Sequence, residues 1–229
     1  MSKSAKSLRM DNAKAVVLAA KKLEAAGLNR GASGNISVRN NDHMLITPSA
    51  VASDQLKPKL IARMTLLDLS GADMKNGLPE WSGPLKPSSE WRFHRDIYRA
   101  RSDINAIVHT HAPWCTVMAV ARKPLPAVHY MMAGFGGADI RIAAYARYGT
   151  QELSDAVLVA LDGRNGCLME NHGMLTIAAT LERAVWLAEE MEALAHQYVH
   201  AALIGGAHVL TDDQVLDAAE AFKTYRPEA

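Results

Sequence analysis

The sequence predicts one α/β domain, with α+β-like character, in which a mixed or mostly antiparallel central β-sheet lies between helices in three layers. Segments with helical periodicity alternate with short apolar runs to the end of the chain. These runs are brief and recur in hairpin-like pairs, which favours an antiparallel or mixed sheet. A length of 229 residues allows a sizeable core, so we expect one domain over residues 1–229.

The first expected element is a helix over residues 9–27, which Gly27 ends. Its apolar positions recur at helical spacing and form one stripe: Val16, Val17, Ala20 and Leu23. Residues 1–8 precede this pattern and are expected to be flexible.

A glycine-rich segment, GASGNISVR at residues 31–39, follows the helix. Gly31 and Gly34 permit backbone conformations that other residues resist, and exposed N–H groups in such a turn can bind phosphate. From the residues alone, a plain connecting loop explains the segment equally well. Short apolar runs bounded by turn residues predict strands over residues 36–39, 44–47 and 64–69.

The rest of the chain continues the alternation. A Gly- and Pro-rich stretch over residues 73–87 is expected to form an exposed loop. Beyond it we expect a helix over 89–101, a strand over 105–109, and helices over 113–121 and 181–204. The last helix has the clearest period, and its predicted apolar face consists of Leu181, Ala184, Val185, Ala188, Met191, Ala195, Tyr198, Val199 and Ala202.

Composition limits the classes of partner. The net charge is +1, from 25 basic and 24 acidic residues, so no electrostatic footprint for nucleic acid or a membrane surface is indicated. No apolar run predicts a transmembrane helix, and the N-terminal segment is too polar for a secretory signal. Cys115 and Cys167 form no CxxC motif, which favours reduced thiols in the cytoplasm. We therefore expect a cytoplasmic protein that acts on a small molecule.

Two histidines lie two positions apart at the end of a predicted strand. Because side chains alternate along a strand, His109 and His111 point to one face and Thr110 points to the other. Two imidazoles on one face can share a metal ion, and a catalytic zinc usually has three protein ligands. His172, in the turn-like ENHG, is the candidate for the third. An ordinary surface or core histidine pair is the alternative explanation.

Ser88, Ser89 and Glu90 open the predicted helix over 89–101. The simplest explanation is a cap, in which a serine hydroxyl accepts from free N–H groups and the helix dipole favours the carboxylate. The same helix N-terminus can hold an anion. Together with the two histidines one strand later, it favours a functional site.

Two other pairs have helical spacing. His196 and His200 lie four positions apart and could bind metal, but no acidic partner or HExxH motif accompanies them, so an exposed helix face explains them. Glu90 and His94 are also four apart, which is typical of a structural pair on a helix.

A series of motifs occurs in a recognisable order: GASGNISVR (31–39), LITPS (45–49), KPSSEWRFH (86–94), AIVHTHAPWCT (106–116), PAVHYM (126–131), ENHGML (170–175) and AFKTY (221–225). With these motifs the chain closely resembles the class II aldolase/adducin family, and within it the L-fuculose-phosphate aldolase-like branch. The resemblance covers roughly residues 10–226.

The resemblance implies an aldolase that reversibly cleaves a ketose 1-phosphate to dihydroxyacetone phosphate and an aldehyde. It also implies one Zn²⁺ per subunit, with Mn²⁺ or Co²⁺ as alternatives, held by the residues matching His109, His111 and His172. As a Lewis acid, zinc can polarise a carbonyl and stabilise the enediolate that forms when the adjacent carbon loses a proton. The glutamate matching Glu90 first completes the coordination of the metal and then acts as the base.

Substrate contacts are implied in the same way. The positions that match phosphate-binding residues of the family are Asn35, Ser49, Ser88 and Ser89. The family often has Thr-Gly where this chain has Ser49 and Ala50, which keeps a hydroxyl but removes the glycine. Tyr148 and Phe222 match the pocket for the aldehyde tail. Both are aromatic and suit a partly apolar tail, as in L-fuculose 1-phosphate or a 5-deoxy- or 5-methylthio-pentulose 1-phosphate.

Two tyrosines are implied to reach the site of a neighbouring subunit. The residue matching Tyr130 protonates the aldehyde oxygen in the bond-forming direction, and Tyr225 matches a second tyrosine, for which an interface or core role is the equal alternative. The resemblance thus implies a homo-oligomer, a tetramer as in the family, with active sites at subunit interfaces. Residues 222–229 would form a tail near a neighbouring active site.

Three other classes of protein share some of these features with an aldolase. Ribulose-phosphate 4-epimerases share the fold, but typically have aspartate at the position of Glu90 and a different segment in place of PAVHYM. Adducin-like binding modules tend to have lost the metal histidines, which this chain retains. A zinc-hydroxide hydratase or hydrolase needs water at the metal rather than an anchored anion, and the phosphate-binding features argue against it.

Overall fold

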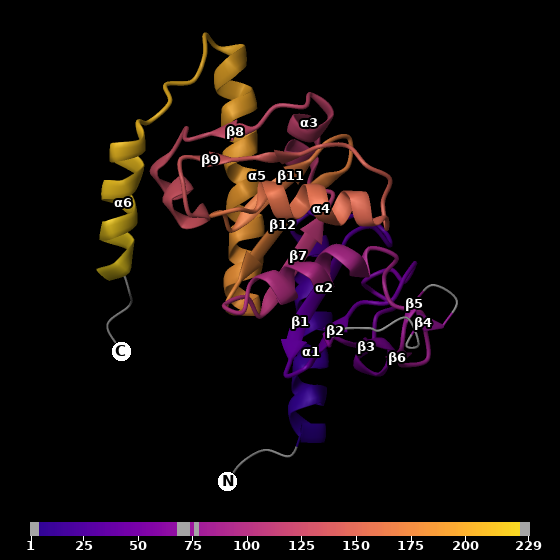
Figure 1. Ribbon diagram of the computed structural model, residues 1–229. Helices are drawn as coiled ribbons and strands as arrows, with labels where there is room; N and C mark the ends of the chain where they lie inside the picture. Colours follow the sequence, from indigo (N-terminus) through magenta and orange to yellow (C-terminus); the bar gives the residue numbers. More distant parts are fainter. Residues whose placement is uncertain (1–4, 68–73, 76–77, 225–229) are drawn as a thin grey trace.

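The computed structural model describes residues 5–67, 74–75 and 78–224 of the chain (Figure 1). Its centre is an eight-stranded sheet in the order β10-β11-β12-β7-β1-β2-β3-β6. All neighbouring pairs are antiparallel except β10 and β11, which confirms the predicted mixed, mostly antiparallel sheet. The strands are β1 (Asn35–Asn40), β2 (His43–Ile46), β3 (Ala62–Thr65), β6 (Trp81–Ser82), β7 (Ala106–Thr110), β10 (Ile142–Ala143), β11 (Gly166–Met169) and β12 (Gly173–Ala178).

Helices cover both faces of the sheet, as predicted. One face carries α1 (Ala5–Ala25), α3 (Pro113–Val120) and α5 (Leu181–Leu203), and the other carries α2 (Trp91–Ala100) and α4 (Gln151–Ala160). Figure 1 shows α2 and α4 side by side on their face. Because side chains alternate along β7, Val108 joins the core under the first group of helices, and Ile107 joins the core under the second.

The remaining elements are outside the eight-stranded sheet and the five helices that cover it. They are η1 (Pro58–Leu60), β4 (Met74–Lys75), β5 (Leu78–Pro79), β8 (Leu125–Pro126), η3 (Tyr130–Phe135), β9 (Asp139–Ile140) and α6 (Asp212–Thr224). Figure 1 shows α6 standing apart from the sheet, and its main contact within the described residues is with η3. None of the helices in the described part of the chain is both long and apolar enough to cross a membrane.

Several predicted boundaries shift in the structure. Helix α1 begins at Ala5, so residues 5–8 are helical. The strand expected over 64–69 is β3, which ends at Thr65 because Thr65 pairs with His43, the first residue of β2; residues 68–69 lie outside the described residues. The stretch over 73–87 is not a plain loop, since β6 within it pairs with β3 and extends the sheet.

The buried face of α5 differs from the predicted apolar face. Leu187 and Leu194 are buried although the single-stripe pattern omitted them, whereas Ala202 is exposed. The helix packs against α1, α3, β7 and β12, so its buried surface is wider than one stripe, and its last turn extends past the sheet.

Strand β7 fixes the position of the candidate site. It lies between β12 and β1, and all five of its residues are buried. His109 stands opposite Asn35 on one neighbour and Leu175 on the other. A strand paired along both edges offers a rigid support for functional side chains.

Candidate active site

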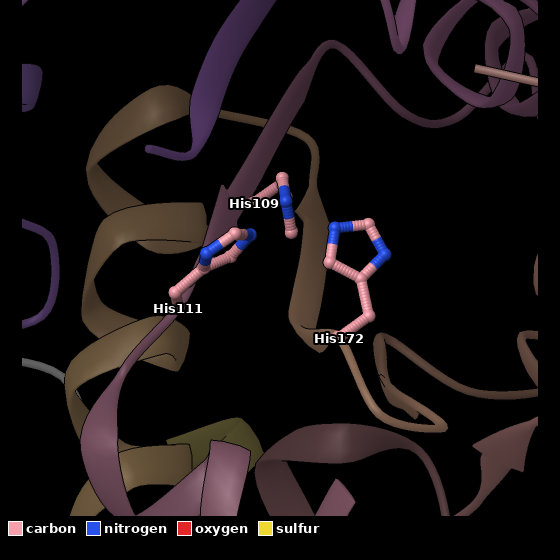
Figure 2. Close-up of side chains that lie close together, drawn as sticks. All are labelled: His109, His111 and His172. Carbon is pink, nitrogen blue, oxygen red and sulfur yellow. The ribbon is translucent and has the colours of Figure 1, made fainter. Parts of the chain in front are cut away.

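Three histidines from two segments converge at the end of β7. His109 belongs to β7, His111 directly follows it, and His172 lies in the turn between β11 and β12. Their ligand atoms all lie within 4.8 Å of one another, and Figure 2 shows the three rings gathered around a common centre. Gly173 makes the approach of this turn feasible, because a Cβ there would lie 2.5 Å from the carbonyl oxygen of Thr110.

The donor atoms fit a metal ion. The Nδ1 atom of His109 lies 2.8 Å from the carbonyl oxygen of Met174, which can only accept, so Nδ1 carries the hydrogen and Nε2 keeps its lone pair. Among the described residues, neither Nε2 of His109 nor Nε2 of His111 has a hydrogen-bond partner, although both atoms are buried. Three convergent imidazoles, once His109 has given up its proton to the incoming ion, are the donor set of a zinc-type site with an open position.

A carboxylate completes the centre. Glu90, which is only 7% exposed, is the N-cap residue of α2. Its Oε2 lies 3.2 Å from Nε2 of His109, and its Oε1 lies 3.2 Å from Nε2 of His172. Oε2 also accepts a hydrogen bond of 2.8 Å from Nδ2 of Asn35. Glu90 is therefore placed to coordinate the same ion as the histidines or to act beside it.

The electrostatics of the cluster favour a cation. Burial opposes ionisation of Glu90, but the neighbouring His109 and His172 and the Asn35 hydrogen bond hold its carboxyl pKa well below its usual range. Burial also opposes protonation of His109, yet the Glu90 carboxylate raises its pKa above the ordinary value. Burial and the charge of His109 lower the pKa of His111 and of His172 to about 4. Positive charge is thus stabilised beside Glu90, where a divalent cation would replace the proton.

A buried polar chain, which the sequence did not reveal, leads away from Glu90. His94 is fully buried, with Nε2 hydrogen-bonded to Oδ1 of Asn35 and Nδ1 2.7 Å from Oγ of Ser37. Tyr98 continues the chain, with its hydroxyl 2.9 Å from the same Oγ. The four-residue spacing of Glu90 and His94 suggested a direct pair on one helix, but Asn35 of β1 bridges them. Burial lowers the pKa of His94 to about 3, so its imidazole is neutral.

A pocket of about 320 Å³ opens above the centre. Most of the predicted site residues line it: Asn35, Ser49, Ser88, Ser89, Glu90, His111, Tyr148 and His172. His109 lies behind this wall and is completely buried. Ala50, also in the lining, has a φ of 57°, the left-handed conformation that favours glycine, so the loop keeps a glycine-like backbone without the glycine.

The serines beside the pocket do not form the N-cap hydrogen bond of α2 that the sequence suggested. No side chain caps the N-cap position of this helix, and the Ser88 hydroxyl instead accepts from the N–H of Glu90, at 3.3 Å. Ser89 is exposed in the pocket. The first turn of α2 therefore adds its positive end to the polar wall of the pocket.

Other predicted site residues lie away from this pocket. Tyr130, which is 53% exposed, and Phe222 face each other across η3 and α6, with ring centroids 6.0 Å apart. Both line a second cavity at the outer side of α5. Tyr225 lies outside the described residues. The roles of these residues in substrate binding or proton transfer stay predictions.

The second histidine pair belongs to a cluster of aromatic rings. His196 and His200 pack around the Trp114 ring, with centroids 4.6 and 4.8 Å from it. In the described ranges, no third ligand joins them. They form an aromatic cluster on an exposed helix face, in line with the simpler explanation.

Fold and site together define an α/β enzyme built around a histidine metal centre. The Class II Aldolase and Adducin N-terminal domain matches residues 14–199. The chain belongs to the class II aldolase and adducin family, which confirms the resemblance found in its motifs.

Proteins similar to this chain have the names of sugar-phosphate aldolases. The 5-methylthioribulose-1-phosphate/5-deoxyribulose-1-phosphate aldolase of Rhodospirillum rubrum is 47% identical, over 92% of this chain and 90% of the relative. The L-fuculose phosphate aldolase of Escherichia coli K12 is 41% identical, over 87% of this chain and 88% of the relative. A solved L-fuculose 1-phosphate aldolase superposes with a TM-score of 0.85 at 38% identity, covering 97% of this chain and 98% of the other. The predicted enzyme class, a class II aldolase, is confirmed.

Proposed function

We propose that this enzyme reversibly cleaves a ketose 1-phosphate to dihydroxyacetone phosphate and an aldehyde. One observation carries the proposal: a carboxylate and three convergent histidines form the base of a pocket whose wall contains serines and a helix N-terminus. Such a pocket can hold a phosphate at one end and a carbonyl at the metal centre at the other. Its volume of about 320 Å³ suits a small phosphorylated sugar.

The phosphate end of the substrate is assigned to the wall opposite the histidines. Ser49 and Ser89 present exposed hydroxyl groups there, and Ser88 stands beside them. A phosphate accepts hydrogen bonds from hydroxyl and N–H donors and is favoured by the positive end of α2. The side chain of Asn35 is engaged by Glu90 and His94, so we assign its phosphate contact to the backbone.

The metal is assigned as one Zn²⁺ per subunit, held by His109, His111 and His172, with Glu90 as a fourth ligand before substrate binds. When bound, zinc supplies Lewis-acid stabilisation of the negative charge that develops on the ketose oxygens. In the bond-forming direction, Glu90 takes a proton from C3 of dihydroxyacetone phosphate, C3 bonds to the carbonyl carbon of the aldehyde, and a tyrosine hydroxyl donates its proton to the aldehyde oxygen, which becomes the C4 hydroxyl. Glu90 then releases its proton to solvent and the tyrosine regains one from solvent, and cleavage follows the same steps in reverse.

The tail of the aldehyde is assigned to the aromatic side of the pocket. Tyr145 and Tyr148 line it and are 61% and 65% exposed, so they offer apolar surface at its mouth. Such a surface favours a methyl or methylthio tail over a hydroxylated one. Two relatives carry names for substrates of this kind, a 5-methylthio- or 5-deoxyribulose 1-phosphate and an L-fuculose phosphate.

A substrate screen tests this assignment. Three ketose 1-phosphates, namely those of 5-deoxyribulose, 5-methylthioribulose and L-fuculose, are incubated with the zinc-loaded enzyme, and dihydroxyacetone phosphate is measured by coupled reduction. We expect turnover of at least one, and more than about tenfold lower kcat/KM for the matching pentulose with a free 5-hydroxyl. Equal turnover of the hydroxylated compound would contradict the apolar tail pocket, and no release from any of them would contradict the proposed substrate class.

The proton donor is assigned to a neighbouring subunit. Tyr130 lies outside the pocket of its own chain, with Phe222 beside it, so the Tyr130 hydroxyl would reach a reacting oxygen only in the pocket of another copy. We therefore propose a homo-oligomer, a tetramer in the simplest case, with active sites at subunit boundaries. The enzyme is placed in the cytoplasm, where the free thiols of Cys115 and Cys167 stay reduced.

Mixed oligomers test the shared site. Subunits with Glu90→Gln and subunits with Tyr130→Phe are each expected to be nearly inactive, but co-assembled oligomers contain some sites with both native residues. These oligomers should regain a measurable fraction of wild-type kcat, above the sum of the parent variants. Native mass spectrometry of differently tagged subunits verifies the mixing. Verified mixed oligomers without recovery would place the Tyr130 hydroxyl within its own chain or outside the reaction.

A further inference from the structure

The polar chain beneath Glu90 is buried along its whole length. Ser37 and His94 are 0% exposed, Tyr98 is 1% exposed, and Asn35 is 5% exposed. It joins β1 to α2, and each link is a hydrogen bond between side chains. Burying so many polar groups is costly unless each is satisfied, and satisfied networks of this kind fix one arrangement of their side chains.

The chemistry of the groups sets the direction of every hydrogen bond. The ionised Glu90 carboxylate can only accept, so the Asn35 amide must present its NH₂ to it and its oxygen to His94. The oxygen of Asn35 requires the hydrogen of His94 to be on Nε2, so Nδ1 of His94 accepts from the Ser37 hydroxyl. The Ser37 oxygen then accepts from Tyr98. All four links therefore donate toward the carboxylate.

The hydrogen bond from Asn35, at the end of the polar chain, makes the two oxygens of Glu90 different. Oε2 is anchored by the 2.8 Å hydrogen bond from Asn35, whereas Oε1 accepts no hydrogen bond among the described residues and lies 3.2 Å from Nε2 of His172, on the side of the histidine centre. The hydrogen bond at one oxygen limits rotation of the carboxyl group and so fixes the position of the other oxygen.

We propose that His94 is a positioning residue for the catalytic base: it fixes the Asn35 amide, which holds Oε2 of Glu90 and leaves Oε1 to exchange the proton with C3 of the substrate. The inference rests on the proposed function, in which Glu90 is the base. Neither His94 nor Ser37 touches substrate in this arrangement, so their effect passes entirely through Asn35.

Two amide substitutions at His94 separate this role from a general packing role. Glutamine can place a donor near Nε2 of the native imidazole and so restore the bond to Asn35. Asparagine is shorter and reaches only the position of Nδ1, toward Ser37. Both replace a buried imidazole with a buried amide, so they are matched in polarity. We measure C3 proton exchange of dihydroxyacetone phosphate in deuterated water, its dissociation constant, bound zinc and thermal unfolding.

His94→Gln is expected to keep the exchange rate constant at saturating ligand within about threefold of wild type, whereas His94→Asn should lower it by about 10- to 100-fold, as expected for a misplaced catalytic group. Both should bind near-stoichiometric zinc and have similar dissociation constants. Equal loss in the two variants, or no loss in His94→Asn, would overturn the proposal.

A measurement on the unmodified protein covers the case in which a variant does not fold. Long-range ¹H–¹⁵N correlation spectra of imidazole-labelled enzyme report the tautomer of each histidine. A neutral His94 with its hydrogen on Nε2 is expected, and a hydrogen on Nδ1 would overturn the directed chain. Wild-type enzyme that fails to exchange the C3 proton would contradict the proposed function instead, while the tautomer would still decide the direction of the hydrogen bonds.

Discussion

Glu90→Gln is expected to lower the exchange of the C3 proton of dihydroxyacetone phosphate with deuterated water by about 100- to 10,000-fold. The amide keeps the size of the side chain and can still meet Asn35, but it cannot accept the proton. Because the neighbouring histidines and Asn35 keep the pKa of Glu90 below its usual range, the carboxylate is ionised at neutral pH and ready to act as a base. Exchange is followed by proton NMR.

Binding and stability must be retained for this result to identify the base. The variant should still bind dihydroxyacetone phosphate and much of its zinc, because the three histidines are intact. Since Glu90 is also the N-cap residue of α2, thermal unfolding is measured in parallel. Glu152→Gln in the first turn of α4, at an exposed glutamate, provides a matched control that should exchange normally. Near-normal exchange by Glu90→Gln would assign the base to another group.

Alanine at any one of His109, His111 and His172 is expected to weaken metal binding by more than about 100-fold. Each histidine contributes one of the three ligand atoms gathered within 4.8 Å, so two remaining donors do not hold the ion at ordinary concentrations. Elemental analysis after dialysis should find most of the zinc lost, and cleavage activity should fall with it.

A histidine outside the centre supplies the comparison for these variants. His196→Ala removes an exposed imidazole from the cluster around Trp114, and it should retain the wild-type metal content. Circular dichroism checks that each variant keeps its fold. Near-stoichiometric zinc in all three alanine variants of the central histidines would contradict the assignment of this centre.

The histidine centre could be predicted from local patterns. Alternation along a strand placed His109 and His111 on one face, and the ENHG turn suggested His172 as the third donor. These patterns depend on short-range geometry, and the central strand β7 preserves it because it is paired on both edges. The layered architecture was predictable for the same reason, since periodicity reports which face of each element is buried.

The support behind Glu90 could not be predicted in this way. Its links join Ser37 to His94 and Tyr98, residues 57 and 61 positions apart, and no local period reports such pairs. The order of the strands also depends on contacts between distant parts of the sequence. Strand β1 pairs with β7, although β2 to β6 lie between them in the sequence. Helical spacing suggested a direct contact between Glu90 and His94, but Glu90 stands at the N-cap and its side chain turns to Asn35 of β1 instead.

The most direct test of the proposed aldol cleavage is a ¹³C NMR time course, with the zinc-loaded enzyme, of whichever of the three ketose 1-phosphates is converted fastest. The C3–C4 bond is expected to break, so the signals of the ketose should give way to those of dihydroxyacetone phosphate and one aldehyde, and chelation of the metal should stop the change. An intact carbon chain with an inverted carbon would indicate an epimerase, and loss of water from an intact chain would indicate a dehydratase. Either result would contradict the assignment of Glu90 and the histidine centre to aldol cleavage.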